Sequence, residues 1–560
     1  MYENVPQRFL PEQLPDLSFG HPDVDYVHNT EVLNATHELL ERGIEEGGWG
    51  DRPVVRRHDH GDVVTYDELH DMVNRFAAAL RELGVEPGDR VLWRFDEVIE
   101  AFVTAHAVWK VGGINVPSAL AERGREMTFF VEDTEPRFLV ATARDFEPAA
   151  QALDATDHVE EVIVDGADEV DGDHHEFHDL LETHEPFEGH ADTAPLDVAT
   201  IYYTGGTTGR PKGCVHSHAT EVIGADTEGG DGRNYTTEDV FFTPAPLGHT
   251  WGCGEKMTLP LRFGASTVLA DRPDPAGFLE IIEEHGVTIF AGAPTMLRMM
   301  MNHADVPGSD LSSLRLCIMA GEVLDPETAD RWTEQSGIEP FNGFGMTPLR
   351  IFVATSYRDS EPLADPPAIG RPHAGYEVKI VDIEDPTVEM GRDEPGRLAV
   401  RGPTGICYWN NAHPDMPERM DDDLHDGWSL VDDAFTMDED GNLFFVSRLD
   451  NMIVSGGRQI AGPEVEEVLS EHAAVSEVAV VGAPDDERGE VVKAFVVPAD
   501  GHDPGDDLVD DLQTYAKGEM AVYKYPRRIE FIDEMPKDDV GKIQRKELRD
   551  REQESTDAAV

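Results

Sequence analysis

Residues 201–213 read IYYTGGTTGRPKG, an apolar, strand-like segment that runs directly into a loop rich in glycine and threonine. Glycine lets successive backbone N–H groups turn toward one anion, and threonine hydroxyls add uncharged hydrogen-bond donors. Such a loop is typical of a site that surrounds phosphate groups. It differs from the Walker loop, in which Gly-Lys-Ser/Thr opens a helix, because Pro211 precedes Lys212. The stretch alone leaves open an ordinary glycine-rich turn with a solvated lysine.

The composition is that of a globular protein with an unusual charge. The chain has 560 residues, 40% of them hydrophobic, which is enough for at least two domains with sizeable cores. It carries 113 acidic and 45 basic residues, and the resulting net charge of −68 is spread along the whole chain. Such self-repulsion is tolerable near 1 M salt, where the Debye length is about 3 Å. We therefore expect a halophilic protein that binds neither nucleic acid nor an anionic membrane.

The N-terminal sequence and the cysteines bear on where the protein works. No apolar run reaches the roughly 18 residues of a membrane-spanning helix, and the first residues, MYENVPQRFLPEQ, lack the pattern of a signal peptide. We expect a cytoplasmic protein. The cysteines are too scattered for a disulfide framework or a thiolate metal site, and we expect all four in the core: Cys214, Cys253, Cys317 and Cys407.

Alternating helix and strand patterns predict an α/β fold. Apolar residues at helical spacing over residues 66–83 precede the strand-like RVLWRF, and a second helical pattern over residues 98–113 precedes INVP. From about residue 376 the texture changes to short strands separated by acidic turns. We expect a large N-terminal domain of mixed α/β subdomains with a small β-barrel layer, residues 1–449, and a small α+β C-terminal domain, residues 450–560.

Further motifs follow the opening loop in a fixed order. They are PLGHTWG (246–252), AGE (320–322), NGFGMTP (342–348), GWSLVDD (427–433), SRLDNMIVSGGRQIAGPEVE (447–466) and PKDDVGKIQR (536–545). Together they resemble the AMP-forming adenylating superfamily, which includes acyl-CoA synthetases and luciferases, and the resemblance covers nearly the whole chain. The stretches RFLPEQLPDL, LNATHELLERG and GRLAVRGPTG look most like the branch of benzoate and 2-aminobenzoate CoA ligases.

The resemblance implies an ATP-dependent, AMP-forming carboxylate–CoA ligase. A small-molecule carboxylic acid, with Mg²⁺ present, would attack the α-phosphate of ATP and expel pyrophosphate. The thiol of coenzyme A would then attack the acyl-adenylate and release AMP. An aromatic acid such as benzoate or 2-aminobenzoate is expected. A short- or medium-chain fatty acyl-CoA synthetase, and a protein that binds a nucleotide or acyl-adenylate with impaired adenylation, remain alternatives. A homodimer also stays open.

The resemblance further implies which residues contact the nucleotide. The loop from Thr204 to Gly209 would surround the leaving phosphates, while Asp433 and Arg448 would bond the ribose hydroxyls. Either of these two residues could instead belong to a surface ion pair. The full set expected at ATP and AMP is Thr204, Gly205, Gly206, Thr207, Thr208, Gly209, Lys212, Glu322, Asn342, Gly343, Phe344, Thr347, Asp433 and Arg448.

Other motif residues are expected at the reacting groups. His249, Trp251 and Gly345 would line the acyl pocket, with His249 as a catalytic residue beside the path of the thiol. Core packing is the alternative for His249 and Trp251. Lys542 resembles the family's catalytic lysine, which bridges the substrate carboxylate and the α-phosphate while negative charge accumulates between them.

In the family the C-terminal domain moves between the two half-reactions. The resemblance implies a hinge at Asp450. It also implies that a loop with Gly456 and Gly457 then enters and shapes the tunnel for coenzyme A. Since Lys542 lies in the same domain, that domain has to close over the nucleotide for the first half-reaction.

The chain departs from the family where a Mg²⁺ ligand is expected. The family has a glutamate after the Gly-x-Thr of NGFGMTP, whereas this chain has Pro348, so the protein ligand of the metal is unknown. We expect no metal at the acidic stretch 165–179, which fits a solvated loop, or at Cys214, His216 and His218, which follow the phosphate loop.

Overall fold

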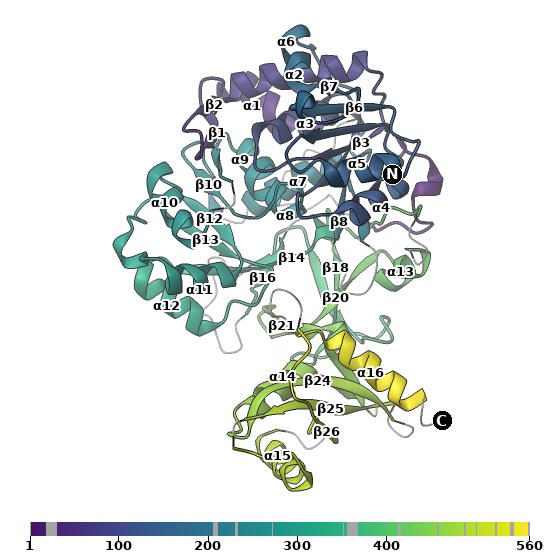
Figure 1. The fold of residues 1–560 in the computed structure, drawn as a ribbon, viewed down its shortest axis with the longest axis vertical. Helices are drawn as coiled ribbons and strands as arrows, with labels where there is room; N and C mark the ends of the chain where they lie inside the picture. Colours follow the sequence, from purple (N-terminus) through teal and green to yellow (C-terminus); the bar gives the residue numbers. More distant parts are fainter. Residues whose placement is uncertain are drawn as a thin grey trace. The chain divides into compact units, whose positions relative to one another are not determined.

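The chain folds into two compact units, each described by itself. In the computed structural model (Figure 1) these units are residues 1–378 with 400–430, and residues 379–399 with 431–560. The residues that the structure describes are 2–17, 31–204, 211–229, 233–271, 273–350, 352–355, 368–412, 416–455, 458–485, 489–499, 501–520, 524–537 and 543–557.

A seven-stranded sheet carries the first half of the first unit. Its order is β7-β6-β5-β3-β4-β8-β9, and every neighbouring pair is parallel except β8 and β9. The predicted β-α-β unit is present, since the helix expected over 98–113 is α3 and INVP lies in β4. The strands are β3 (Arg90–Arg94), β4 (Ile114–Ser118), β5 (Phe138–Thr142), β6 (Glu161–Asp165), β7 (His175–Glu176), β8 (Val198–Thr204) and β9 (Lys212–Ser217).

A nine-stranded sheet carries the second half of this unit. Its order is β16-β15-β14-β13-β12-β10-β11-β1-β2, with a parallel centre and antiparallel strands at both edges. The strands are β1 (Pro53–Arg57), β2 (Val63–Thr65), β10 (Val240–Phe242), β11 (Ser266–Leu269), β12 (Ile289–Gly292), β13 (Leu316–Met319), β14 (Pro340–Gly345), β15 (Phe352–Thr355) and β16 (Arg371–Pro372).

The helices of the first unit cover these sheets, and α10, α11 and α12 pack one beside the next (Figure 1). They are α1 (Arg42–Gly47), α2 (Tyr66–Glu82), α3 (Ile99–Lys110), α4 (Gly124–Thr134), α5 (Glu147–Asp154), α6 (Phe177–Thr183), α7 (His218–Glu228), α8 (Thr250–Cys253), α9 (Leu259–Arg262), α10 (Pro275–His285), α11 (Pro294–His303), α12 (Pro326–Ser336) and α13 (Met416–Asp423). Short π-helices span His37–Glu41 and Gly254–Thr258.

Local sequence explains where the helices start and which face they bury. In α2 the Thr65 hydroxyl accepts from the N–H of Glu68, whose carboxylate accepts from the N–H of Thr65, so two unpaired N–H groups are satisfied. One stripe of α2 is buried, including Leu69, Val73 and Phe76, as the helical spacing predicts. By contrast, α3 is buried along its whole length, including its polar residues Glu100, Thr104, His106 and Lys110.

Two further sheets account for the rest of the chain. The short strands predicted from about residue 376 form a five-stranded sheet. The chain passes from one unit to the other inside three of its strands, which are β17, β18 and β20. The C-terminal residues form a second five-stranded sheet with three helices. The elements are β17 (Glu377–Val381), β18 (Gly396–Arg401), β19 (Leu424–His425), β20 (Trp428–Met437), β21 (Leu443–Arg448), β22 (Met452–Ser455), β23 (Arg458–Ala461), α14 (Gly462–Ser470), β24 (Val475–Asp485), β25 (Gly489–Pro498), α15 (Asp506–Glu519), β26 (Arg528–Phe531) and α16 (Arg545–Asp557).

The α/β fold predicted from the sequence is confirmed, whereas the domain boundary at 449/450 stays a prediction. The four cysteines are buried and free, as expected. Within the described part of the chain, no helix is both long and apolar enough to span a membrane.

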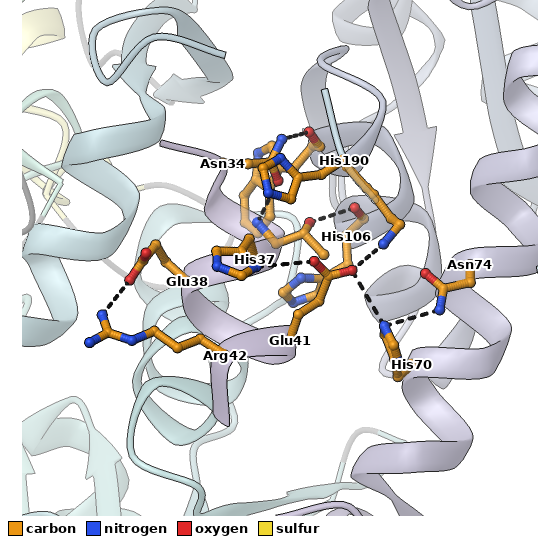
Figure 2. A network of polar contacts seen from close by, with 12 residues as sticks. Asn34, His37, Glu38, Glu41, Arg42, His70, Asn74, His106 and His190 are labelled. Carbon is orange, nitrogen blue, oxygen red and sulfur yellow. Dashed lines mark hydrogen bonds and ion pairs between the residues drawn. The ribbon is translucent and has the colours of Figure 1, made fainter. Parts of the chain in front are cut away.

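A buried ion pair ties three helical segments of the first unit together (Figure 2). Lys110, at the end of α3, contacts Glu41, and both side chains are almost fully buried. Figure 2 labels Glu41 together with the two histidines that also contact it. His37 Nδ1 and His70 Nε2 lie 3.4 and 3.3 Å from the same carboxylate. Burial opposes ionisation, but the hydrogen bonds from the two histidines and the charge of Lys110 hold the pKa of Glu41 well below its ordinary value.

We expect Glu41→Gln to lower the free energy of unfolding by about 3–5 kcal/mol, because Lys110 would be left as a buried charge without its anion. Denaturant titration in molar KCl measures this. The control is Glu46→Gln on the same segment, because Glu46 pairs with Arg42 and its side chain is 70% exposed. It should cost less than about 1 kcal/mol. Equal effects of the two substitutions would contradict a structural role for the buried pair.

Candidate active site

The predicted phosphate loop is held between two paired strands. Thr204 ends β8 and Lys212 begins β9, and the two residues are antiparallel partners. A strand therefore follows the loop where a Walker loop would have a helix. The Thr204 hydroxyl is buried and makes no hydrogen bond to any described residue, so it can donate to a ligand. Five loop residues lie outside the described part of the chain, and their predicted roles stay predictions: Gly205, Gly206, Thr207, Thr208 and Gly209.

The NGFGMTP motif lies at the carboxyl end of a central strand. Asn342, Gly343 and Phe344 belong to β14, and Asn342 is fully buried. The pairing of β14 with β15 shifts register after Phe344, and a short 3-10 helix, Thr347–Leu349, follows. Ligands of open α/β sheets bind at such strand ends, and a register shift re-aims the residues next to it. Both features suit a binding loop.

A cavity of about 170 Å³ opens beside this strand end. Gly345 and Thr347 line it together with Ala320 and Gly321 of the AGE motif. Gly321 has a φ of +79°, in the region that favours glycine, and a Cβ there would approach the Trp251 ring to 3.9 Å. The remaining wall comes from α7, α8, the π-helix Gly254–Thr258, α9 and the residue that follows the Thr347–Leu349 helix. It includes Glu228, Trp251, Glu255, Thr258, Leu259 and Arg350.

The structure separates the two side chains predicted at the acyl group. Trp251 lines the cavity, as does Gly345. His249 is not among the lining residues. Its Nε2 lies 3.8 Å from Oε1 of Glu122, and its side chain is 42% exposed. His249 precedes the first residue of α8 and Trp251 is the second, so the turn into the helix separates their directions. A catalytic role for His249 stays a prediction.

The cavity holds charged side chains that the sequence did not indicate. Arg350 Nη2 lies 2.6 Å from Oε2 of the fully buried Glu221. Arg350 has a φ of +72°, a conformation that costs a non-glycine residue about 1–3 kcal/mol and persists where the surroundings enforce it. The ion pair supplies that enforcement, three residues beyond Thr347. These residues are far apart in sequence, and only the fold brings them together.

Glu255 is the most perturbed carboxyl of the cavity. Burial, followed by the nearby charge of Glu228, raises its pKa to about 8, while Arg233 and the Trp251 side chain oppose the shift. One signal in the sequence could have indicated Glu255. It follows Trp251 by four residues, which is about one helical turn, in the mostly small and apolar stretch WGCGEKMTLPL.

The other predicted contacts differ in how far the structure describes them. In the first unit, Glu322 pairs with Arg298 at 2.9 Å and accepts from the Thr295 hydroxyl, so its carboxylate is already engaged. Lys212 Nζ lies 5.1 Å from the centre of the Tyr408 ring.

In the second unit, Asp433 and Arg448 are neighbours across the β20–β21 pair. Arg448 Nε lies 3.6 Å from Asp433 Oδ1. They form the ion pair that was left open, and the same arrangement presents an acceptor and a donor side by side, as two ribose hydroxyls require.

Of the four residues predicted to act through domain movement, only Asp450 lies in the described part of the chain. Asp450 lies in the 3-10 helix Leu449–Asn451, between β21 and β22, which is a connection short enough for a hinge. Gly456, Gly457 and Lys542 lie outside the described residues. Their roles at the coenzyme A tunnel and at the reacting carboxylate stay predictions.

The position expected to bind Mg²⁺ offers no ligand. Pro348 is buried in the Thr347–Leu349 helix and has no side-chain oxygen, and Glu322 is bonded to Arg298. The described residues at this position therefore supply no Mg²⁺ ligand, and the protein ligand of the metal stays unknown, as the sequence left it.

Burial lowers the pKa of His216 and His218 to about 3, so both are neutral imidazoles. Two groups among the described residues have the spacing of metal ligands. The first is His58, Glu284 and His285, and the second is Glu100, Asp165 and His178. Asp165 and His178 belong to the acidic stretch 165–179.

Comparisons with known proteins agree with the fold and the order of the motifs described above. The family model described as "AMP-binding enzyme" matches residues 45–409, and the one described as "AMP-binding enzyme C-terminal domain" matches residues 464–542. Benzoate–CoA ligase of Thauera aromatica is 33% identical over 524 residues, which cover 93% of this chain and 96% of that protein.

Solved structures give the same result. The anthranilate CoA ligase AuaEII in complex with anthranoyl-AMP has a TM-score of 0.76 at 28% identity, covering 93% of this chain and 98% of that one. ATP-bound MatB from Rhodopseudomonas palustris has a TM-score of 0.77 at 26% identity, covering 93% and 99%. These matches confirm the resemblance, and the chain belongs to the AMP-binding enzyme family as an AMP-forming acyl-CoA synthetase.

Proposed function

We propose that this synthetase activates an aromatic carboxylic acid with a single ring, of the size of benzoate or 2-aminobenzoate. The observation that carries the proposal is the cavity of about 170 Å³ beside the nucleotide motifs. An apolar protein cavity of roughly 150 Å³ is large enough for benzene. Trp251 supplies an aromatic wall, and Gly321 leaves the space next to it open. The similarity to a benzoate–CoA ligase and an anthranilate CoA ligase supports the same substrate class.

The reaction assigned to the site has two half-reactions. A carboxylate oxygen of the acid attacks the α-phosphorus of ATP, and the bond to pyrophosphate breaks. The sulfur of coenzyme A then attacks the acyl carbon, and the bond to AMP breaks. The chain's contribution is positioning and charge neutralisation. Thr204 and its loop would bind phosphates, Asp433 and Arg448 the ribose, and Lys542 the oxygens between the reacting atoms.

The environment in which this takes place belongs to the same proposal. With a net charge of −68, the chain repels itself over about 10 Å at 0.1 M salt and over far shorter distances near 1 M. We therefore place the enzyme in a cytoplasm with molar salt. Assays belong in molar KCl.

Two other functions remain testable alternatives. A fatty acyl-CoA synthetase would need an apolar tunnel, whereas Glu228 and Glu255 line this cavity. A binding protein with impaired adenylation is suggested by the missing Mg²⁺ ligand at Pro348.

An ATP-dependent screen of acids tests the proposal directly. Benzoate, aminobenzoates, hexanoate and propionate are incubated with ATP, Mg²⁺ and coenzyme A in molar KCl, and thioester and AMP are quantified. We expect equimolar thioester and AMP with ring acids and much less with the aliphatic acids. ADP in place of AMP would contradict the reaction, and a preference for hexanoate would contradict the substrate class. Adenylate binding without turnover of any acid would favour the binding protein.

Lys542→Ala should lower pyrophosphate release by about 10²–10³, the loss typical of a removed charge-stabilising donor. Thioester formation from supplied acyl-adenylate should persist, because the lysine would serve only the first half-reaction. Lys546→Ala, at an exposed position of α16, is the matched control and should leave both half-reactions unchanged. An equal loss of both half-reactions in Lys542→Ala would contradict the assignment.

Pro348→Glu should lower the Mg²⁺ concentration that gives half-maximal pyrophosphate release, because it restores a carboxylate ligand where the chain has none. Pro348→Gln controls for the change in size and backbone without adding charge. Thioester formation from supplied acyl-adenylate, which involves no triphosphate, should not respond to Mg²⁺ in any variant. If Pro348→Glu needs as much Mg²⁺ as the wild type, another carboxylate already holds the metal.

A further inference from the structure

The cavity beside β14 has a polar wall for which ring binding alone gives no reason. Glu255 lies in the π-helix Gly254–Thr258, one turn beyond Trp251, and lines the cavity. Its relative exposure is 2%. The Trp251 side chain is close enough to lower its pKa, and Oε2 makes no hydrogen bond of normal geometry to any described residue. A buried carboxylate oxygen without a donor destabilises the folded state. The wall thus contains one carboxyl oxygen to which the described residues supply no hydrogen bond.

The nearby cations are already bonded to other carboxylates. Arg233 Nη1 donates to Glu228 and, at 3.1 Å, to the Tyr235 hydroxyl. Arg350 donates through Nε and Nη2 to Glu221, at 2.8 and 2.6 Å. Among the described residues, no ion pair is recorded for Glu255. The donor for its free oxygen is therefore left to a bound ligand or to water.

The position is one where an apolar side chain would make the protein more stable. A buried acid whose pKa is raised to about 8 by burial and by Glu228 lowers the free energy of unfolding progressively as the pH rises above the ordinary pKa of a glutamate. Replacing buried charged groups with apolar ones of similar size is often neutral or stabilising. A group kept at a stability cost inside a binding cavity is typical of a functional site.

We propose that Glu255 is a specificity-determining residue, which selects aromatic acids whose ring carries a hydrogen-bond donor, an amino group in particular. The inference rests on the proposed activation of a ring acid and narrows it. The acid's carboxylate belongs at the nucleotide motifs, where Gly345 and Thr347 line the cavity, and its substituent would meet the Glu255 carboxylate. An amino group has two N–H donors, and both Glu255 and Glu228 line the cavity.

The experiment compares substituents of nearly equal size that differ in their ability to donate. Aminobenzoates are paired with the methylbenzoates of the same ring position, and kcat/KM is measured for thioester formation in molar KCl. A site built to bond an N–H rejects the analogue without it, and we expect the amino compound at its best ring position to be favoured by about a hundredfold or more. The second comparison is between hydroxybenzoates and fluorobenzoates of the same ring position. Its ratio of kcat/KM shows whether a single O–H donor gives the preference.

Three variants assign the preference to this side chain. Glu255→Leu should abolish or reverse the amino preference while activity on methylbenzoate persists, and its denaturation midpoint should rise. Glu255→Gln keeps an acceptor oxygen and should retain part of the preference. Glu238→Gln, whose side chain is 82% exposed, should match the wild type. A merely structural role would lower the denaturation midpoint of Glu255→Leu and leave the ratio of the two substrates unchanged.

The outcomes separate this inference from the function on which it rests. Equal activity of the wild type on amino and methyl compounds overturns the inference and leaves the proposed function intact, and would indicate that buried water bonds Glu255. The same holds if Glu255→Leu keeps the amino preference. Failure of every ring acid, in all variants that fold, overturns both.

Discussion

The burial of charge is the constraint on which this structure depends. A charge inside a protein has to be paired, and this chain has 45 basic residues against 113 acidic ones. Among the described residues, several buried cations are bonded to a glutamate. In the first unit Lys110 contacts Glu41, and Arg350 contacts Glu221. A protein so rich in acid thus uses its few interior cations to fix helices in place.

The same pairs shape the active-site cavity. Arg350 holds a strained turn three residues after Thr347, at the nucleotide side, because its guanidinium is fixed to α7 through Glu221. Arg233 is bonded to Glu228 at the other end of α7. Glu255 differs from both glutamates because, among the described residues, no arginine or lysine forms an ion pair with it, and its Oε2 makes no hydrogen bond. We therefore assign a structural role to Glu221 and Glu228, which form buried ion pairs, and a role in substrate selection to Glu255, which forms none among the described residues.

Local patterns predicted much of the fold. The stripe of Leu69, Val73 and Phe76 marked α2, and the helical pattern over residues 98–113 marked α3. Motif order predicted the neighbourhood of Asp433 and Arg448, which the structure pairs across two strands.

The acidic wall of the cavity could not be predicted in this way. Its two glutamates, Glu228 and Glu255, come from α7 and the π-helix Gly254–Thr258, and sequence spacing carries no information about contacts made by tertiary packing. His249 and Trp251 show the same limit on a smaller scale, since two residues of one motif diverge where a helix begins.

The central claim is that the substrate's ring occupies the cavity between Trp251 and Glu255. The most direct measurement is a crystal structure of the enzyme, grown in molar salt, with a hydrolysis-resistant analogue of aminobenzoyl-adenylate. The account predicts the ring beside the Trp251 indole and the amino nitrogen within hydrogen-bond distance of Glu255 Oε2. A ring bound elsewhere, or a water molecule on Glu255 with the amino group turned away, would contradict it.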